Sequence, residues 1–219
     1  MLSKMTRPAA ASGKIKKLKD LSAVLRRARG AGRKVALCHG VFDVVHPGHI
    51  VHFKEAASLA DIVVVTVTPD RFVRKGPGRP AFNQGMRLEA LAALEYVDFV
   101  ALNEWPTAVE TIALLKPDLY VKGSEYADPR RDVTGKIGEE ERAVRKAGGK
   151  LVFTGGFTSS SSSIINRHFS LYPPATQEYL ARFRRRHGAD EIISRMKKLS
   201  GLRALVVGGR MPERARMPE

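Results

Sequence analysis

Two histidines three residues apart, His46 and His49, are the side chains of this sequence whose type and spacing best suit chemistry. They follow an apolar run at residues 35–38 that is short and β-branched enough to be a buried strand, and they begin a helical pattern over residues 48–59. The first amides of a helix lack intrahelical partners and carry positive partial charge. Such a strand-to-helix junction favours a phosphate group, with both imidazoles on one face of the first turn.

The histidines end a longer motif, Gly40-Val41-Phe42-Asp43-Val44-Val45-His46-Pro47-Gly48-His49. The pattern Gly-x-Phe-Asp-x-x-His-x-Gly-His resembles the signature of the cytidylyltransferase-like nucleotidyltransferases, which activate glycerol phosphate, ethanolamine phosphate or heptose phosphate with a nucleotide. The resemblance implies that His46 and His49 are catalytic. It also implies nucleotide-binding roles for Gly40, Phe42, Asp43 and Gly48. His39 departs from the family pattern, which more often has a small polar residue before the glycine.

A basic loop rich in glycine and proline follows the second apolar run, at residues 71–80. That composition does not support regular structure, and a solvated surface loop is the alternative to a functional one. In the family that the chain resembles, a lysine of this loop contacts the phosphates. The resemblance therefore implies that Lys75 joins the two histidines as a catalytic residue and that Arg87, in the next helix, lies near the nucleotide.

Residues 117–126, Pro-Asp-Leu-Tyr-Val-Lys-Gly-Ser-Glu-Tyr, form a second motif. They resemble the family segment Pro-Asp-x-x-Val-Lys-Gly-x-[Asp/Glu]-Tyr, which is clearest in the heptose phosphate branch. The resemblance implies that Lys122 and Gly123 line the nucleotide pocket. An exposed charge at the end of a strand is the alternative for Lys122.

A run of serines at residues 159–163 precedes two isoleucines. A flexible serine linker is one interpretation. The isoleucines instead favour a helix start, where hydroxyls and amides can hold phosphate. The family has Ser-Thr-Thr-x-Ile-Ile here, and the resemblance implies that Ser160, Ser161 and Ser162 bind the β- and γ-phosphates.

Together these motifs predict a nucleotidyltransferase that moves CMP or AMP from a nucleoside triphosphate to a sugar phosphate or polyol phosphate and releases pyrophosphate. Mg²⁺ is the expected cofactor and would be bound with the nucleotide. No residue is predicted to hold a metal by itself. The sequence does not decide between CTP and ATP and does not name the acceptor. Because relatives are often dimers, the resemblance implies a homodimer.

Three alternatives compete with this prediction. The core could be a catalytically idle nucleotide-binding module whose basic arms contact RNA or a protein partner. Class I aminoacyl-tRNA synthetases also use His-x-Gly-His, but they need a Lys-Met-Ser-Lys-Ser-like loop, and the nearest string, at residues 195–200, lies on a helical pattern. A zinc site could combine His46, His49 and His52, although this spacing turns the third ring away.

The net charge of +16 comes from the two ends of the chain. Residues 1–33 carry ten Lys and Arg against one acid, and residues 170–219 carry eleven against five, whereas residues 34–169 carry 17 against 16. The near-neutral centre gives no reason to expect nucleic acid as its partner. One cysteine and the absence of a long apolar run predict a cytoplasmic protein without a membrane span.

Strand and helix patterns alternate through the central region, which predicts an α/β fold: a Rossmann-like parallel sheet of about five strands with helices on both faces. The predicted strands are residues 35–38, 62–67, 98–101, 119–121 and 151–153, and the predicted helices are residues 48–59, 84–95, 107–115 and 136–147. The polar motifs follow the strands, so they are expected at the ligand-binding edge of the sheet.

Three regions are expected: a basic leader with an edge helix at 1–33, a nucleotidyltransferase domain at 34–169 and a basic extension at 170–219. Asp20 or Ser22 is expected to cap the edge helix, whereas residues 179–186 predict a basic amphipathic helix. Residues 202–209 resemble the first strand of a ribokinase-type sugar kinase, which some relatives fuse to this transferase. The extension is thus interpreted as a shortened remnant of a kinase domain.

Overall fold

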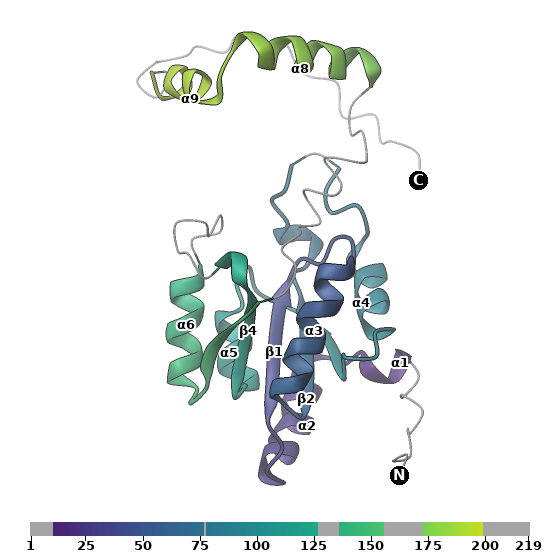
Figure 1. Cartoon of the computed structure of the whole chain (residues 1–219). Helices are drawn as coiled ribbons and strands as arrows, with labels where there is room; N and C mark the ends of the chain where they lie inside the picture. The colour runs from purple at the N-terminus through teal and green to yellow at the C-terminus, as the bar shows by residue number, and fades with distance from the viewer. Residues whose placement is uncertain (1–10, 77, 127–135, 156–172, 199–219) are drawn as a thin grey trace, which may run out of the picture. The chain divides into compact units, whose positions relative to one another are not determined.

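The computed structural model describes residues 11–76, 78–126, 136–155 and 173–198 (Figure 1). The chain divides into two compact units, Met1–Phe169 and Ser170–Glu219. Within the described residues, the first unit holds a five-stranded sheet with helices, and the second holds two helices. The motifs identified in the sequence belong to the first unit.

The sheet is built from strands β1 (Val35–Gly40), β2 (Ile62–Val67), β3 (Phe99–Leu102), β4 (Leu119–Gly123) and β5 (Lys150–Thr154). Their order is β3-β2-β1-β4-β5, and every neighbouring pair is parallel. The predicted Rossmann-like parallel sheet is confirmed. The chain moves outward from β1 to β3 and then returns to place β4 beside β1. The direction in which successive strands are added to the sheet therefore reverses between β1 and β4. Open sheets of this class bind their ligands at that point.

Helices cover both faces of the sheet (Figure 1). Helices α3 (Pro47–Leu59) and α4 (Gln84–Ala92) pack on one face, and α2 (Leu18–Gly30), α5 (Val109–Leu115) and α6 (Ile137–Lys146) pack on the other. Neighbouring residues of β1 point to opposite layers: Cys38 joins the α3 layer and Leu37 joins the α2 layer. Burial raises the pKa of the Cys38 thiol to about 12. Because both faces are covered, the strands need continuous apolar runs, as the sequence has.

The N-terminal helix α2 begins earlier than the sequence indicated. It starts at Leu18, after the short helix α1 (Ala11–Lys14), and no side chain caps it, so the prediction of an Asp20 or Ser22 cap is wrong. Burial of Leu18 explains the earlier start, since burying a leucine contributes about 1.5–3 kcal/mol and a cap about 1 kcal/mol. The helix belongs to the main core and is not only an edge element.

The second unit contains helices α8 (Pro174–Arg186) and α9 (Ala189–Lys198). The basic helix predicted at residues 179–186 lies within α8. Tyr179, Phe183 and His187 form a ladder along one side, with ring centroids 6.0 and 4.7 Å apart. Residues 202–209, predicted to begin a further strand, lie outside the described residues. None of the helices described here combines the length and the apolar character needed to cross a bilayer.

Gly149 joins α6 to β5 at a point where the backbone is too close for any side chain. A Cβ atom there would lie 2.2 Å from the carbonyl oxygen of Pro117 and 3.0 Å from that of Asp118. We expect Gly149→Ala to lower the free energy of unfolding by about 3 kcal/mol, because backbone must move to admit the methyl group. Urea denaturation of the purified protein measures this change.

Gly30 provides the matched control for that substitution. It ends α2, and a Cβ atom there would meet nothing within 4 Å. Gly30→Ala is therefore expected to change stability by no more than about 1 kcal/mol. Equal denaturation midpoints for the two variants would contradict the steric argument for Gly149.

Candidate active site

The loop after β1 brings Gly40 and Phe42 into close contact. The backbone of Phe42 has φ of 51°, a left-handed conformation that is unusual for a side chain of this size. Its ring folds back over Gly40, where a Cβ atom would lie 3.1 Å from the ring. The same ring meets His49 edge-on at 5.1 Å and packs on Phe53 at 5.5 Å. The Phe42 ring therefore packs between Gly40 and the two rings of α3, His49 and Phe53.

His46 and His49 meet at the start of α3. His46 is the residue before the first helical turn, Pro47 opens that turn, and no side chain caps the helix. The two imidazole rings are 3.8 Å apart between centroids and are inclined by 32°. The predicted pair on one face of the first turn is thus present. It lies at the carboxyl end of β1, beside the first-turn amides and Gly48, where positive partial charge favours phosphate.

The His49 ring is neutral at physiological pH in the absence of ligand. Burial, followed by electrostatic interactions with His46, His52 and Lys75, lowers its pKa to about 3. Its Nδ1 atom is buried and has no hydrogen-bond partner among the described residues. A neutral imidazole can still donate one N–H to a phosphate oxygen. His49 therefore has unused hydrogen-bonding capacity.

His52 has a separate, structural place on the same helix. Its Nδ1 lies 2.8 Å from the Thr154 hydroxyl at the end of β5, and Glu55 accepts from the Gly155 amide at 2.9 Å. Burial and the charge of Lys122 lower the pKa of His52 to about 4. No three His, Cys, Asp or Glu side chains in the described parts of the chain form a group suited to a metal ion.

His39, the residue that departs from the family pattern, is held between two threonines. Its Nδ1 lies 3.0 Å from the Thr66 hydroxyl, and its Nε2 lies 3.3 Å from that of Thr68. Burial and the charge of Lys122 lower its pKa to about 3. His39 is thus a neutral ring whose two nitrogens are both engaged.

These lowered pKa values predict that the protein loses stability in mild acid. Below the ordinary histidine pKa of about 6.5, the histidines of the unfolded chain become protonated, whereas His39, His49 and His52 of the folded protein stay neutral down to about pH 3–4. The free energy of unfolding therefore falls as the pH falls. At pH 5 each ring is expected to cost about 1–2 kcal/mol. Urea denaturation at pH 7.5 and pH 5.0 measures the loss.

His39→Asn is expected to shrink that pH-dependent loss by about 1–2 kcal/mol, whatever it does to stability at pH 7.5. His187→Asn, in the second unit, is the control and should leave the loss unchanged. An undiminished loss in His39→Asn would show that the His39 ring is protonated in the folded protein.

The basic loop carries Lys75 within electrostatic range of His49. Lys75 is exposed, and its ammonium group makes no hydrogen bond or ion pair with any described residue. Partial desolvation and the nearby charge of Arg79 lower its pKa. Lys75 is also close enough to His49 to lower the pKa of that ring. The structure therefore brings His46 and His49 together and places Lys75 within electrostatic range of His49; these are the three residues predicted to be catalytic.

Asp43 and Arg79 form a buried ion pair that sequence reasoning missed. Arg79 Nε donates to Asp43 Oδ2 at 2.6 Å, and the two side chains are 3% and 0% exposed. Asp43 was predicted to bind nucleotide, but here its oxygens face the basic loop. Arg79 carried no prediction, because a loop arginine in a basic stretch gives no local sign of its partner.

Arg87 is buried behind the site with its donors engaged by protein atoms. It is 1% exposed and donates to the carbonyl oxygens of Phe82, Val41 and Thr68 and to the Asp70 carboxylate. These partners lie in the loops that follow β1 and β2 and just before α4. Direct contact with the nucleotide stays a prediction. In this structure Arg87 ties together the loops that carry the site.

Lys122 and Gly123 end β4, on the other side of β1 from the loop that follows β2. Lys122 Nζ lies 3.0 Å from Glu140 Oε2, and both side chains are buried. The ammonium also lies 5.2 Å from the Tyr120 ring and 4.8 Å from the Tyr126 ring. The Glu140 partner was not expected from the sequence, since α6 follows β4 only after a long connection. Ser160, Ser161 and Ser162 lie outside the described residues.

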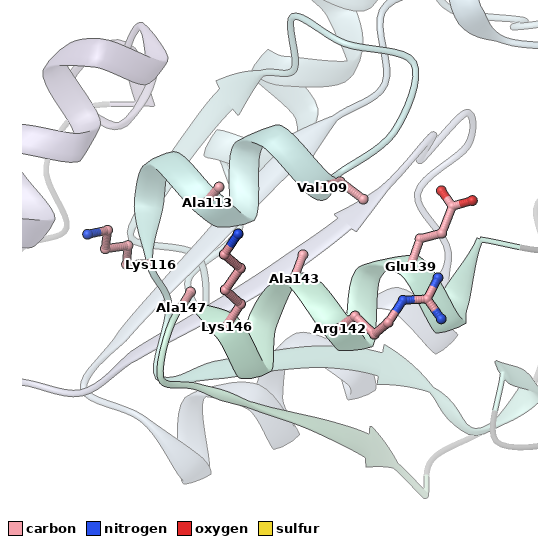
Figure 2. A pocket seen from close by; sticks show the side chains of 8 residues that line it. All are labelled: Val109, Ala113, Lys116, Glu139, Arg142, Ala143, Lys146 and Ala147. Carbon is pink, nitrogen blue, oxygen red and sulfur yellow. The ribbon is translucent and has the colours of Figure 1, made fainter.

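The structure also has a groove of about 580 Å³ between α5 and α6 (Figure 2). Figure 2 shows small side chains on both helices, Ala113, Ala143 and Ala147, with the longer Lys116, Arg142 and Lys146 around them. None of these residues belongs to the sequence motifs. The candidate active site is therefore the edge between β1 and β4 and not this groove.

Comparison with known proteins agrees with this arrangement. The model of a protein family described as cytidylyltransferase-like matches residues 37–168. The bifunctional protein HldE of Citrifermentans bemidjiense is 36% identical over 164 residues, which are 73% of this chain and 32% of that protein. HldE of Campylobacter fetus is 38% identical over 159 residues, which are 71% of this chain and 32% of the relative. This chain thus spans about a third of their length.

Among solved structures, a pantoate-beta-alanine ligase from Francisella tularensis, complexed with beta-gamma ATP and beta-alanine, shares the fold. Its TM-score is 0.51 at 15% identity, and the match covers 86% of this chain and 81% of the ligase. At this identity the likeness concerns the fold alone.

Proposed function

Because this chain belongs to the cytidylyltransferase-like family, we propose that it transfers a nucleotidyl group from a nucleoside triphosphate to a sugar phosphate or polyol phosphate. The observation that carries the proposal is the imidazole pair, 3.8 Å apart at the start of α3, beside the point where the sheet reverses direction. Lys75 is close enough to His49 to lower the pKa of that ring. This is an arrangement of donors and positive charge suited to a phosphate chain.

The reaction needs no covalent intermediate on the protein. An oxygen of the acceptor phosphate attacks the α-phosphorus in line, the bond to the bridging oxygen of the β-phosphate breaks, and pyrophosphate leaves with that electron pair. The protein has to align the two substrates and to balance the added negative charge. In this proposal His46 and His49 donate N–H groups to the α-phosphate oxygens, and Lys75 supplies a full positive charge.

Mg²⁺ is proposed to arrive with the nucleotide, where it would neutralise the leaving pyrophosphate. The carboxylates described around the site already accept hydrogen bonds from protein donors, so they are poorly suited to bind the ion. Asp43 accepts from Arg79 and backbone amides, and Asp70 accepts from Arg87 and the Gln84 amide. The phosphate oxygens and water are therefore the expected ligands of the ion, as is usual for Mg²⁺ bound with nucleotides.

The resemblance of residues 117–126 to the heptose phosphate branch favours a sugar phosphate as acceptor. ATP and CTP both remain candidates for the donor. Calorimetric titration with each nucleotide in the presence of Mg²⁺ will identify it. A panel of sugar and polyol phosphates, assayed for pyrophosphate release, then identifies the acceptor. Light scattering during size exclusion tests the proposed homodimer.

The double variant His46→Ala, His49→Ala is the control for the titration. Binding of one nucleotide that weakens in this variant supports the site, whereas equal binding by both proteins would place the nucleotide elsewhere. Selective binding without pyrophosphate release from any acceptor favours the idle nucleotide-binding module. Absence of binding to either nucleotide would overturn the proposal.

A further inference from the structure

Asp43 stands three residues before His46, yet its carboxylate faces the basic loop. One oxygen, Oδ2, accepts from Arg79 Nε at 2.6 Å. The other, Oδ1, accepts from the Ala81 amide at 2.6 Å and more weakly from the Phe82 amide at 3.4 Å. Asp43 is 1% exposed. A single buried carboxylate thus joins the loop between β1 and α3 (residues 41–46, the histidine-bearing loop) to the C-terminal end of the basic loop, its far end.

The near end of the basic loop has its own attachment. Asp70 accepts from the Gln84 amide at 3.0 Å, and its own amide donates to Gln84 Oε1 at 3.2 Å. Between the two attachments, residues 74–76 and 78 make no hydrogen bond with any described residue. Lys75 lies in this stretch. Its position is therefore set by what holds the two ends of the loop.

Lys75 lies within electrostatic reach of both partners of the pair and of the His49 imidazole. Arg79 lowers the pKa of Lys75 and Asp43 raises it, after the effect of desolvation. Lys75 in turn contributes to the low pKa of His49. Movement of the far end of the loop would carry the Lys75 ammonium away from the histidines.

We propose that the Asp43–Arg79 ion pair is a positioning device that holds the basic loop against the histidine-bearing loop and so keeps Lys75 beside the imidazole pair. Neither residue needs to touch substrate. The glycines allow this loop many alternative conformations, and a buried pair opposes them because separating its partners would leave a buried charge uncompensated. The inference rests on the proposed function only for what Lys75 does to the phosphates.

A double-mutant cycle on turnover tests whether Arg79 acts through Lys75. Displacing a catalytic group by about 1 Å can cost about 10²-fold in rate, so Arg79→Ala is expected to lower kcat for pyrophosphate release by about 10- to 100-fold. In a Lys75→Ala background the same substitution should change kcat by less than about twofold. Arg79→Lys, which keeps a cation facing Asp43, should recover most of the loss.

An equal loss in both backgrounds would overturn the proposal, because Arg79 would then act independently of Lys75. Unchanged kcat in Arg79→Ala would overturn it as well. Arg74→Ala is the matched control, since it removes one exposed cation from the same loop without touching the pair. It should leave kcat within about twofold of the parent protein.

Tryptic cleavage of the full chain tests the same pair without any turnover. Arg74 and Lys75 are cleavable positions in the loop, whereas Pro80 protects the bond after Arg79. Arg79→Ala is expected to speed cleavage at residues 74–75 at least tenfold, while circular dichroism monitors global folding. The variant Asp43→Asn, Arg79→Ala removes both charges and keeps the test valid if Arg79→Ala fails to fold.

Cleavage at the parental rate in both variants would overturn the positioning role. If the parent protein releases no pyrophosphate with any donor and acceptor, the proposed function fails. The proteolysis result would still decide whether the pair holds the loop, so the two failures can be told apart.

Discussion

His46→Ala and His49→Ala are each expected to lower kcat for pyrophosphate release by about 10²- to 10³-fold, the usual cost of removing one preorganised donor to a developing charge. The rings lie 3.8 Å apart at the start of α3, and the Phe42 ring packs edge-on against His49. We therefore expect both imidazoles to be preorganised for contact with phosphate oxygens. Steady-state kinetics with the donor identified by calorimetry measures the effect.

Lys54→Ala is the matched control for the histidine variants. Lys54 is an exposed cation on the same helix, and its removal should leave kcat within about twofold. Thermal denaturation of the three variants checks that the helix is intact. Near-normal turnover in both histidine variants would end their assignment as catalytic residues, even if nucleotide binding persisted.

Arg87→Met is expected to lower the free energy of unfolding by about 3–5 kcal/mol. The substitution keeps much of the side-chain volume but removes every donor. The carbonyl oxygens of Val41, Thr68 and Phe82 then lose this donor. The Thr68 bond is buried and the other two are partly buried, and a buried unsatisfied group costs about 1–3 kcal/mol before relaxation. Urea denaturation measures the loss.

Arg71→Ala serves as the control for Arg87→Met. Arg71 is exposed, donates one hydrogen bond to the Glu104 carbonyl and lies over the Phe72 ring. Its loss should cost no more than about 1 kcal/mol. If the two variants unfold at the same urea concentration, the buried network around Arg87 contributes far less than its contacts indicate.

Much of the fold could be predicted because its strands are buried on both faces. Every residue of β2 is buried, so the sequence Ile-Val-Val-Val-Thr-Val has to be apolar almost throughout, and such runs alternate with helical patterns. The start of α2 was missed for a physical reason. A cap is visible locally in the sequence, whereas the burial of Leu18 depends on strands that lie far along the chain.

The site could be predicted in part for a related reason. His46 and His49 are neighbours on one helical turn, so their spacing alone brings the rings together. Arg87 was expected near the nucleotide, but its four acceptors come from three separate segments. The Glu140 partner of Lys122 and the Arg79 partner of Asp43 likewise lie 18 and 36 residues away in sequence. Residue type identifies a charge, but only the fold identifies its partner.

The rate at which a thiol reagent labels the single cysteine, Cys38, can report how often the folded domain unfolds. Cys38 lies in the central strand with no exposed surface, and its raised pKa keeps the thiol protonated, so a thiol reagent should not modify the native chain. Labelling then requires the helix layer of α3 and α4 to separate from the sheet, because the Cys38 side chain is packed under it, and so it measures large-scale unfolding under native conditions. A ligand that binds only the folded state should slow labelling in proportion to its occupancy. Nucleotides and acceptors could thus be ranked by protection of one sulfur atom, without any assay of catalysis.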